Sequence, residues 1–86
     1  MNKTTRLNKT GQEVWVKTYI DKANGFKYIP ATVDYRLDND VHFTNCVIRW
    51  SPRENVVTEK PNDSDCLNIR TYAEFDAIVA SSTPKA

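Results

Sequence analysis

The chain has 86 residues, 40% of them hydrophobic and 27% charged, a composition that predicts one small globular domain. Its net charge of +1 is unevenly distributed, because residues 1–12 carry three bases and no acid, whereas residues 13–80 carry eleven acids and eight bases. The folded body is therefore predicted to be mildly acidic, which argues against the basic surface that grips a nucleic-acid backbone.

The sequence contains no apolar run long enough to span a membrane, and its first residues lack the hydrophobic segment of a signal peptide. We therefore expect a cytoplasmic protein without a membrane partner. Because cytosolic thiols rarely pair, Cys46 and Cys66 are expected to be reduced.

Residues 1–12 are polar and aperiodic and are predicted to form a flexible leader. Residues 13–20 form the first predicted strand, and Asn24-Gly25 ends a five-residue hairpin loop before a return strand over residues 26–29. Pro30 has no amide hydrogen, so it is expected to end the return strand or to lie at an edge or bulge. Alternation in the first strand places Val14, Val16 and Ile20 on one face and Trp15, Lys17 and Tyr19 on the other.

Residues 32–50 are predicted to form the central hairpin of the sheet, with a turn at Asp38-Asn39-Asp40. The alternation of apolar residues slips by one step in the second half, which predicts a β-bulge near Asn45. The apolar face is expected to comprise Val33, Tyr35, Leu37, Val41 and Phe43 and, beyond the slip, Cys46, Ile48 and Trp50.

The last third of the chain is predicted to contain a loop, a strand and a helix. Residues 51–65 are irregular apart from a short strand within residues 56–58, and residues 66–70 are expected to form the last strand. Thr71-Tyr72-Ala73-Glu74 matches a capping box and predicts a helix over residues 72–80, followed by a flexible tail over residues 81–86. The apolar face of this helix would comprise Tyr72, Phe75, Ile78 and Val79.

Together these elements predict an α+β domain over residues 13–80, with four to five antiparallel strands and one C-terminal helix packed on one face of the sheet. One short helix covers one face, so the other face is expected to stay open. Trp15, Lys17 and Tyr19 would lie on that open face, where two large aromatic residues are unusual unless they bind something. The alternative is that the loop 51–65 covers them.

The sequence offers no catalytic or metal site. His42 and Cys46 lie four residues apart, about 13 Å along a regular strand, which is too far for a catalytic dyad. These two residues and Cys66 lack the CxxC or HxxxH spacing of a zinc site. The paired aspartates at 38/40 and 63/65 lack the glycine and distal glutamate of a calcium loop. We therefore predict a protein that is not an enzyme, with no cofactor, no metal and no evident small-molecule substrate.

Single-stranded nucleic acid is the alternative ligand, because aromatic residues beside Lys17 and Lys27 could stack on unpaired bases. The order of Ile48-Arg49-Trp50, Pro61, a strand over 66–69 and a helix over 72–79 resembles the single-stranded-DNA-binding domain of a family of transcriptional coactivators. That likeness covers only the second half of the chain. Ser64-Asp65 also stands where that family has a basic Lys-Gly, so the chain is not assigned to it.

The preferred prediction is a protein-interaction module that associates with itself or with a macromolecular partner. Tryptophan, tyrosine and arginine anchor protein interfaces, and lysines at the rim keep the free protein soluble. The expected binding residues are Trp15, Lys17, Tyr19 and Lys27 on the sheet face and Arg53 and Glu54 in the loop 51–65. A domain of this size suits a small regulator or inhibitor encoded by a phage or another mobile element.

Overall fold

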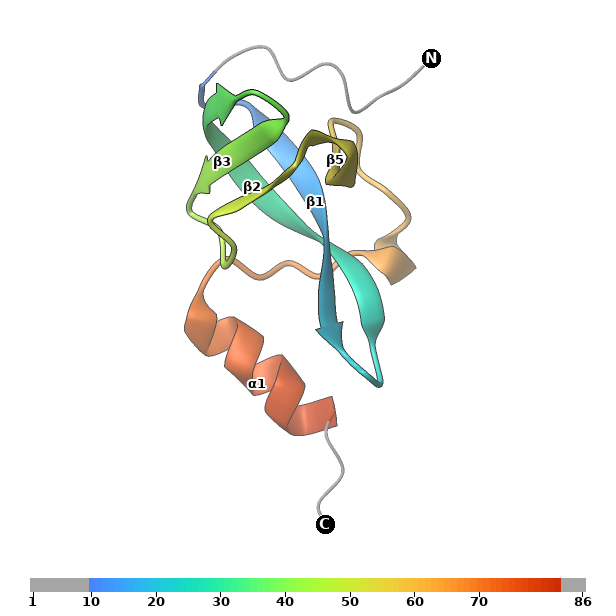
Figure 1. Ribbon diagram of the computed structural model, residues 1–86. Coiled ribbons are helices and arrows are strands. Elements are labelled where there is room, and N and C mark those ends of the chain that lie inside the picture. The colour runs from blue at the N-terminus through green and yellow to red at the C-terminus, as the bar shows by residue number, and fades with distance from the viewer. Residues whose placement is uncertain (1–9, 83–86) are drawn as a thin grey trace.

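The computed structural model describes residues 10–82 and shows one antiparallel sheet of five strands with a single C-terminal helix, α1 (Tyr72–Ser82) (Figure 1). The predicted α+β class is confirmed. Across the sheet the strands follow the order β4-β3-β2-β1-β5. Their bounds are β1 (Glu13–Asp21), β2 (Gly25–Leu37), β3 (Asp40–Thr44), β4 (Trp50–Pro52) and β5 (Val56–Val57), with short 3₁₀ turns η2 (Arg53–Asn55) and η3 (Asp63–Asp65).

The two edges of the sheet, β4 and β5, are separated along the chain only by the three residues of η2. Four residue steps from Pro52 to Val56 span at most about 14 Å. Five strands in a flat sheet would hold their edges about 19 Å apart. The sheet must therefore curl, so that its edges approach one another and its concave side is enclosed.

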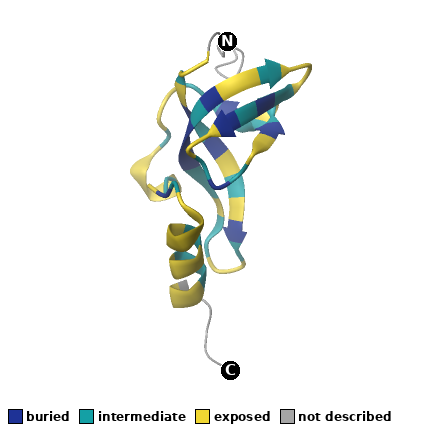
Figure 2. Ribbon diagram, turned by 90° about the vertical axis from the view of Figure 1, so that its left-hand side faces the viewer, coloured by how far each residue is buried: buried dark blue, intermediate teal, exposed yellow. Residues whose placement is uncertain are grey.

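The hydrophobic core fills this concave side and is built mainly from valine, whose branched side chain packs well on a pleated surface. Its buried members are Val14, Val16, Ile29, Ala31, Val33, Val41, Phe43, Val47, Val56 and Ile69. The buried residues lie in the strands and the segments beside them, whereas most of the surface of α1 is exposed (Figure 2). The curled sheet, more than the helix, thus encloses the core.

The first hairpin confirms the predicted alternation of β1, but β2 does not end at Pro30 as a separate strand. It continues through Pro30, which pairs with Trp15 of β1. Tyr28 lies two residues before Pro30, so the main-chain groups of both residues point to the same edge of β2. That edge faces away from β1, because the Tyr28 carbonyl accepts a hydrogen bond there from Leu67 N at 2.8 Å. Pairing with β3 begins only at Thr32, so the missing N–H of Pro30 costs the sheet no hydrogen bond.

The irregularity in the central hairpin lies in β2 and not near Asn45. The register between β2 and β3 shifts by one residue between Val33 and Tyr35. The residues of β2 after Val33 therefore face the opposite side of the sheet from the one that the alternation predicts. As a result Tyr35 and Leu37, predicted to be inside, are exposed. The turn that joins β2 to β3 contains Asp38 with a positive φ of 55°.

Asn45 ends β3 instead of bulging it. Its φ of 56° lies in the left-handed region, which asparagine tolerates better than most residues. The chain reverses over residues 45–49 and returns as β4, with Phe43 N donating to Arg49 O at 3.0 Å. This reversal buries Val47, and Cys46 and Ile48 pack partly buried against the core as predicted. Trp50 is exposed, so its predicted place on the apolar face is wrong.

Residues 66–70 do not form the predicted last strand. Only Cys66 makes a bridge, which is parallel to Tyr28, and residues 67–70 follow without regular pairing. Ile69 nevertheless reaches the core, and Arg70 Nη2 forms an ion pair with Glu13 Oε1 at 2.9 Å. The segment therefore connects α1 to the N-terminal end of β1.

The predicted capping box at the start of α1 is confirmed. Glu74 N donates to Thr71 Oγ1 at 3.1 Å, and the Glu74 carboxylate accepts from Thr71 N at 3.2 Å and from Arg70 N at 2.9 Å. Phe75 and Ile78 pack against the core, whereas Tyr72, predicted on the same face, is exposed.

The expected leader 1–12 and tail 81–86 lie mostly outside the described residues. Of the leader, Gly11 N donates to Val33 O at 2.7 Å and Thr10 Oγ1 donates to Asp34 O at 2.7 Å, so this part is tied to β2. Within residues 10–82, no helix is both long and apolar enough to cross a bilayer.

Candidate interaction surfaces

Trp15 is only partly available on the outer face of β1. It lies between Pro30 of β2 and Val57 of β5 and is half-buried. Lys60, from the loop 51–65, places its Nζ 5.6 Å from the centre of the indole ring. That distance allows a cation–π contact, so the loop partly covers this tryptophan.

Lys17 and Tyr19 are exposed and share a surface with Phe26 of β2, which we call the hairpin-tip patch. Tyr19 and Phe26, opposite each other in the register, are 52% and 59% exposed and contact edge to face with ring centres 5.4 Å apart. Lys17 Nζ lies 5.5 Å from the Phe26 ring centre. Lys17 and Tyr19 were predicted from the sequence, whereas Phe26 was not, although the hairpin spacing could have placed it beside Tyr19.

The other three predicted binding residues do not join this patch. Lys27 pairs with Thr18, and its Nζ donates to Ser64 O at 2.7 Å, which holds η3 against β2. Arg53 N donates to Asn39 O at 2.7 Å, so Arg53 connects the end of β4 to the β2–β3 turn. Glu54 is exposed in η2. Of the six predicted residues, the structure brings together only Lys17 and Tyr19 on one open surface.

A second aromatic surface crosses β2, β3 and β4 on the outer side of the curled sheet. Tyr35 pairs with His42, and His42 pairs in turn with Trp50, so the three rings form a line across three strands, which we call the aromatic row. The rings of Tyr35 and His42 are stacked, 4.3 Å apart and inclined by 8°. Tyr35 is 48% and Trp50 is 52% exposed.

The aromatic row lines a shallow depression of about 350 Å³, which Asp34 and Arg49 also border. One acidic and one basic side chain therefore flank the rings. Exposed large aromatic residues held on adjacent strands are the kind of surface that binds partners. The row was not predicted from the sequence, because the register shift in β2 and the reversal at Asn45 decide which residues face outward. Neither feature is visible in the alternation pattern.

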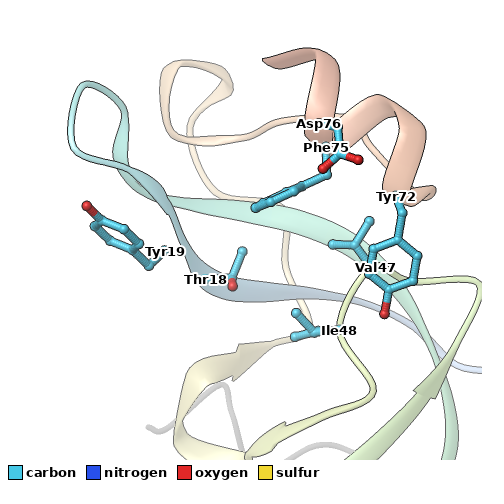
Figure 3. Close-up of a pocket in the computed structure, with 7 residues that line it drawn as sticks. All are labelled: Thr18, Tyr19, Val47, Ile48, Tyr72, Phe75 and Asp76. Atoms are coloured by element: carbon cyan, nitrogen blue, oxygen red, sulfur yellow. The ribbon is translucent and has the colours of Figure 1, made fainter. Parts of the chain in front are cut away.

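A narrower groove of about 230 Å³ lies between α1 and the turn at residues 45–49 (Figure 3). Its lining is mostly apolar, and Asp76 supplies its one charged side chain. The residues that line it are Thr18 and Tyr19 of β1, Val47 and Ile48 of the turn, and Tyr72, Phe75 and Asp76 of α1.

The two cysteines and the histidine each lie in a defined local environment. Burial raises the pKa of both the Cys46 and the Cys66 thiol, which keeps them in the less reactive protonated form. Cys66 Sγ lies 3.6 Å from Pro61 O, and His42 is stacked on Tyr35. Among residues 10–82, no group of three or more histidine, cysteine, aspartate or glutamate side chains is placed to hold a metal ion.

Comparison of this chain with models of known protein families, with curated proteins and with solved structures finds no match.

Proposed function

We propose that this domain is a non-enzymatic protein-interaction module whose main contact surface is the aromatic row. The observation that carries the proposal is the line of Tyr35, His42 and Trp50 across three paired strands, with two of the rings about half exposed. Strands fix the spacing of the rings, so little conformational entropy is lost when a partner binds them. A small regulator or inhibitor in the cytoplasm would act in this way, by occupying a surface of its target.

Charge favours a protein over single-stranded nucleic acid as the partner. Residues 13–80 carry eleven acids against eight bases, and Arg49 beside the row is balanced by Asp34. Proteins that bind single strands combine stacking rings with a positively charged groove that follows the phosphates. The aromatic row offers the rings without such a groove.

The test begins with a photo-crosslinking amino acid introduced at Trp50 in cells of the source organism. Leu37 is the matched control position, because it is 59% exposed on β2 of the same sheet but does not line the depression. We expect a specific protein adduct from position 50 and none from position 37. Equal adducts from both positions would contradict the proposal.

The partner identified in this way is then purified and its affinity measured with variants. Truncation of one interface anchor typically costs at least about 2 kcal/mol, or roughly 30-fold in Kd. Tyr35→Ala combined with Trp50→Ala should therefore weaken binding by at least that factor. Leu37→Ala should leave it within about twofold, and circular dichroism should show both variants folded.

An oligonucleotide titration tests the alternative directly. Quenching of tryptophan fluorescence that weakens steeply between 50 and 200 mM salt would favour nucleic acid, because phosphate contacts release counterions. We expect no such quenching.

A further inference from the structure

The groove beside α1 reaches the free edge of β1. Thr18 and Tyr19 both line it, although consecutive residues of a strand point to opposite faces of the sheet. A hollow that touches both must pass over the edge of the strand. Since β2 occupies one edge of β1, the groove lies along the other edge (Figure 3).

That edge presents hydrogen-bonding groups of the main chain. Val33 N donates to Gln12 O at 2.9 Å, so Gln12 and Val33 form a hydrogen-bonded pair. Such pairs recur at every second residue of an antiparallel ladder, so the even-numbered residues of β1 form hydrogen bonds with β2. The N–H and C=O of Tyr19 consequently point away from β2. Pairing with β5 covers only Trp15 and Val16, so within residues 10–82 no strand faces the outer edge at Tyr19.

The residues that line the groove indicate which side chains of a ligand it can bind. Val47, Ile48 and Phe75 make it apolar, and its 230 Å³ exceed the roughly 150 Å³ of an apolar cavity that holds a benzene ring. Asp76 places a carboxylate on the helix side. An apolar side chain would fill the hollow, and a lysine or arginine beside it would complement the carboxylate.

We propose that the groove binds an extended segment of a partner protein that adds to the sheet as a strand beside Tyr19. The segment presents an apolar side chain to Phe75 and Ile48 and a basic side chain to Asp76. An exposed strand edge is a ready template for such pairing, in which main-chain bonds give affinity and a pocket gives specificity. This site lies apart from the aromatic row and does not depend on its function.

The probe is a library of random twelve-residue peptides displayed on phage and selected against the full chain. We expect enriched peptides in which apolar and basic residues alternate. The most enriched peptide is then synthesised, and its Kd is measured by fluorescence anisotropy. Asp76→Lys should weaken it about fivefold or more, since the charge reversal replaces an attraction by a repulsion. Asp65→Lys is the matched control, because it makes the same change on an exposed aspartate outside the groove, and it should leave Kd within twofold.

Amide hydrogen exchange distinguishes strand addition from any other mode of binding. The Tyr19 amide should exchange rapidly in the free protein and become at least about tenfold slower in the peptide complex, because it gains an acceptor. Peptides that bind without slowing this exchange, or that bind the Asp76→Lys variant equally well, would overturn the proposal, as would a selection without enrichment. Tyr35→Ala with Trp50→Ala should leave this binding intact, so the failure of one proposal does not imply the failure of the other.

Discussion

Replacing Thr71 by alanine tests whether the capping box holds α1 on the sheet. In the structure the Thr71 hydroxyl accepts the Glu74 amide at 3.1 Å, and Thr71 O accepts the Phe75 amide at 3.0 Å. The alanine variant keeps the second bond and loses the first. One N–H at the start of the helix is then left to water.

The expected loss follows from removing the hydroxyl, which also donates to the Glu74 carboxylate at 3.2 Å. Removing a threonine cap typically costs about 1 kcal/mol, within a range of about 0.5–2 kcal/mol. For a domain of this size, 1 kcal/mol corresponds to a fall in Tm of about 4–8 °C. Thr71→Ser keeps the hydroxyl oxygen in place and should lose no more than a few tenths of a kcal/mol.

Urea unfolding followed by two probes measures the effect. Circular dichroism reports the helix, whereas fluorescence reports Trp15 and Trp50 on the sheet. Because Phe75 and Ile78 connect α1 to the core, both probes should show the same lowered midpoint for Thr71→Ala. An unchanged midpoint, or an equal loss in Thr71→Ser, would refute the capping argument. A loss seen only by circular dichroism would show that the helix frays without unfolding the sheet.

Three further predictions concern the core, the turn and pH. Ile29 is fully buried, so Ile29→Ala should lose about 2–5 kcal/mol and Ile29→Val about 0.5–1.5 kcal/mol in urea unfolding; equal losses would contradict close packing there. Asn45 has a φ of 56°, so Asn45→Val should lose about 1–2 kcal/mol while Asn45→Gly stays near wild type, and a tolerated valine would exclude the left-handed turn. Hydrogen bonds from Arg70 and Thr32 lower the pKa of Glu13 below its ordinary value of 4.5, and the Arg70 amide, followed by Thr71, lowers the pKa of Glu74. Both carboxylates therefore stabilise the fold above pH 4.5, and this stabilisation is lost as the pH falls through their lowered pKa values in the folded protein. Thermal melts should show the Tm falling over this pH range. The fall should be smaller in a Glu13→Gln, Glu74→Gln variant.

Local sequence determined the elements whose signals lie within a few residues of one another. The capping box fixed the start of α1, because the hydroxyl and carboxylate that satisfy its first amides are three residues apart. Asn24-Gly25 marked the first hairpin, and the alternation of β1 correctly divided Val14 and Val16 from Lys17 and Tyr19. These features predicted the α+β class and two of the three residues of the hairpin-tip patch.

Tertiary structure alone decided that Tyr35 and Trp50, on β2 and β4, face water. A shift of one residue in strand pairing exchanges the two faces of a strand, and the shift in β2 depends on how β2 meets β3. Tyr35 thereby moved outward to join His42 and Trp50, from strands that the sequence did not place in register. The curl of the sheet and the position of α1 likewise result from contacts between distant segments, and they create the groove at the edge of β1. Alternation records which residues share a face, but the pairing of strands determines whether that face lies inside or outside.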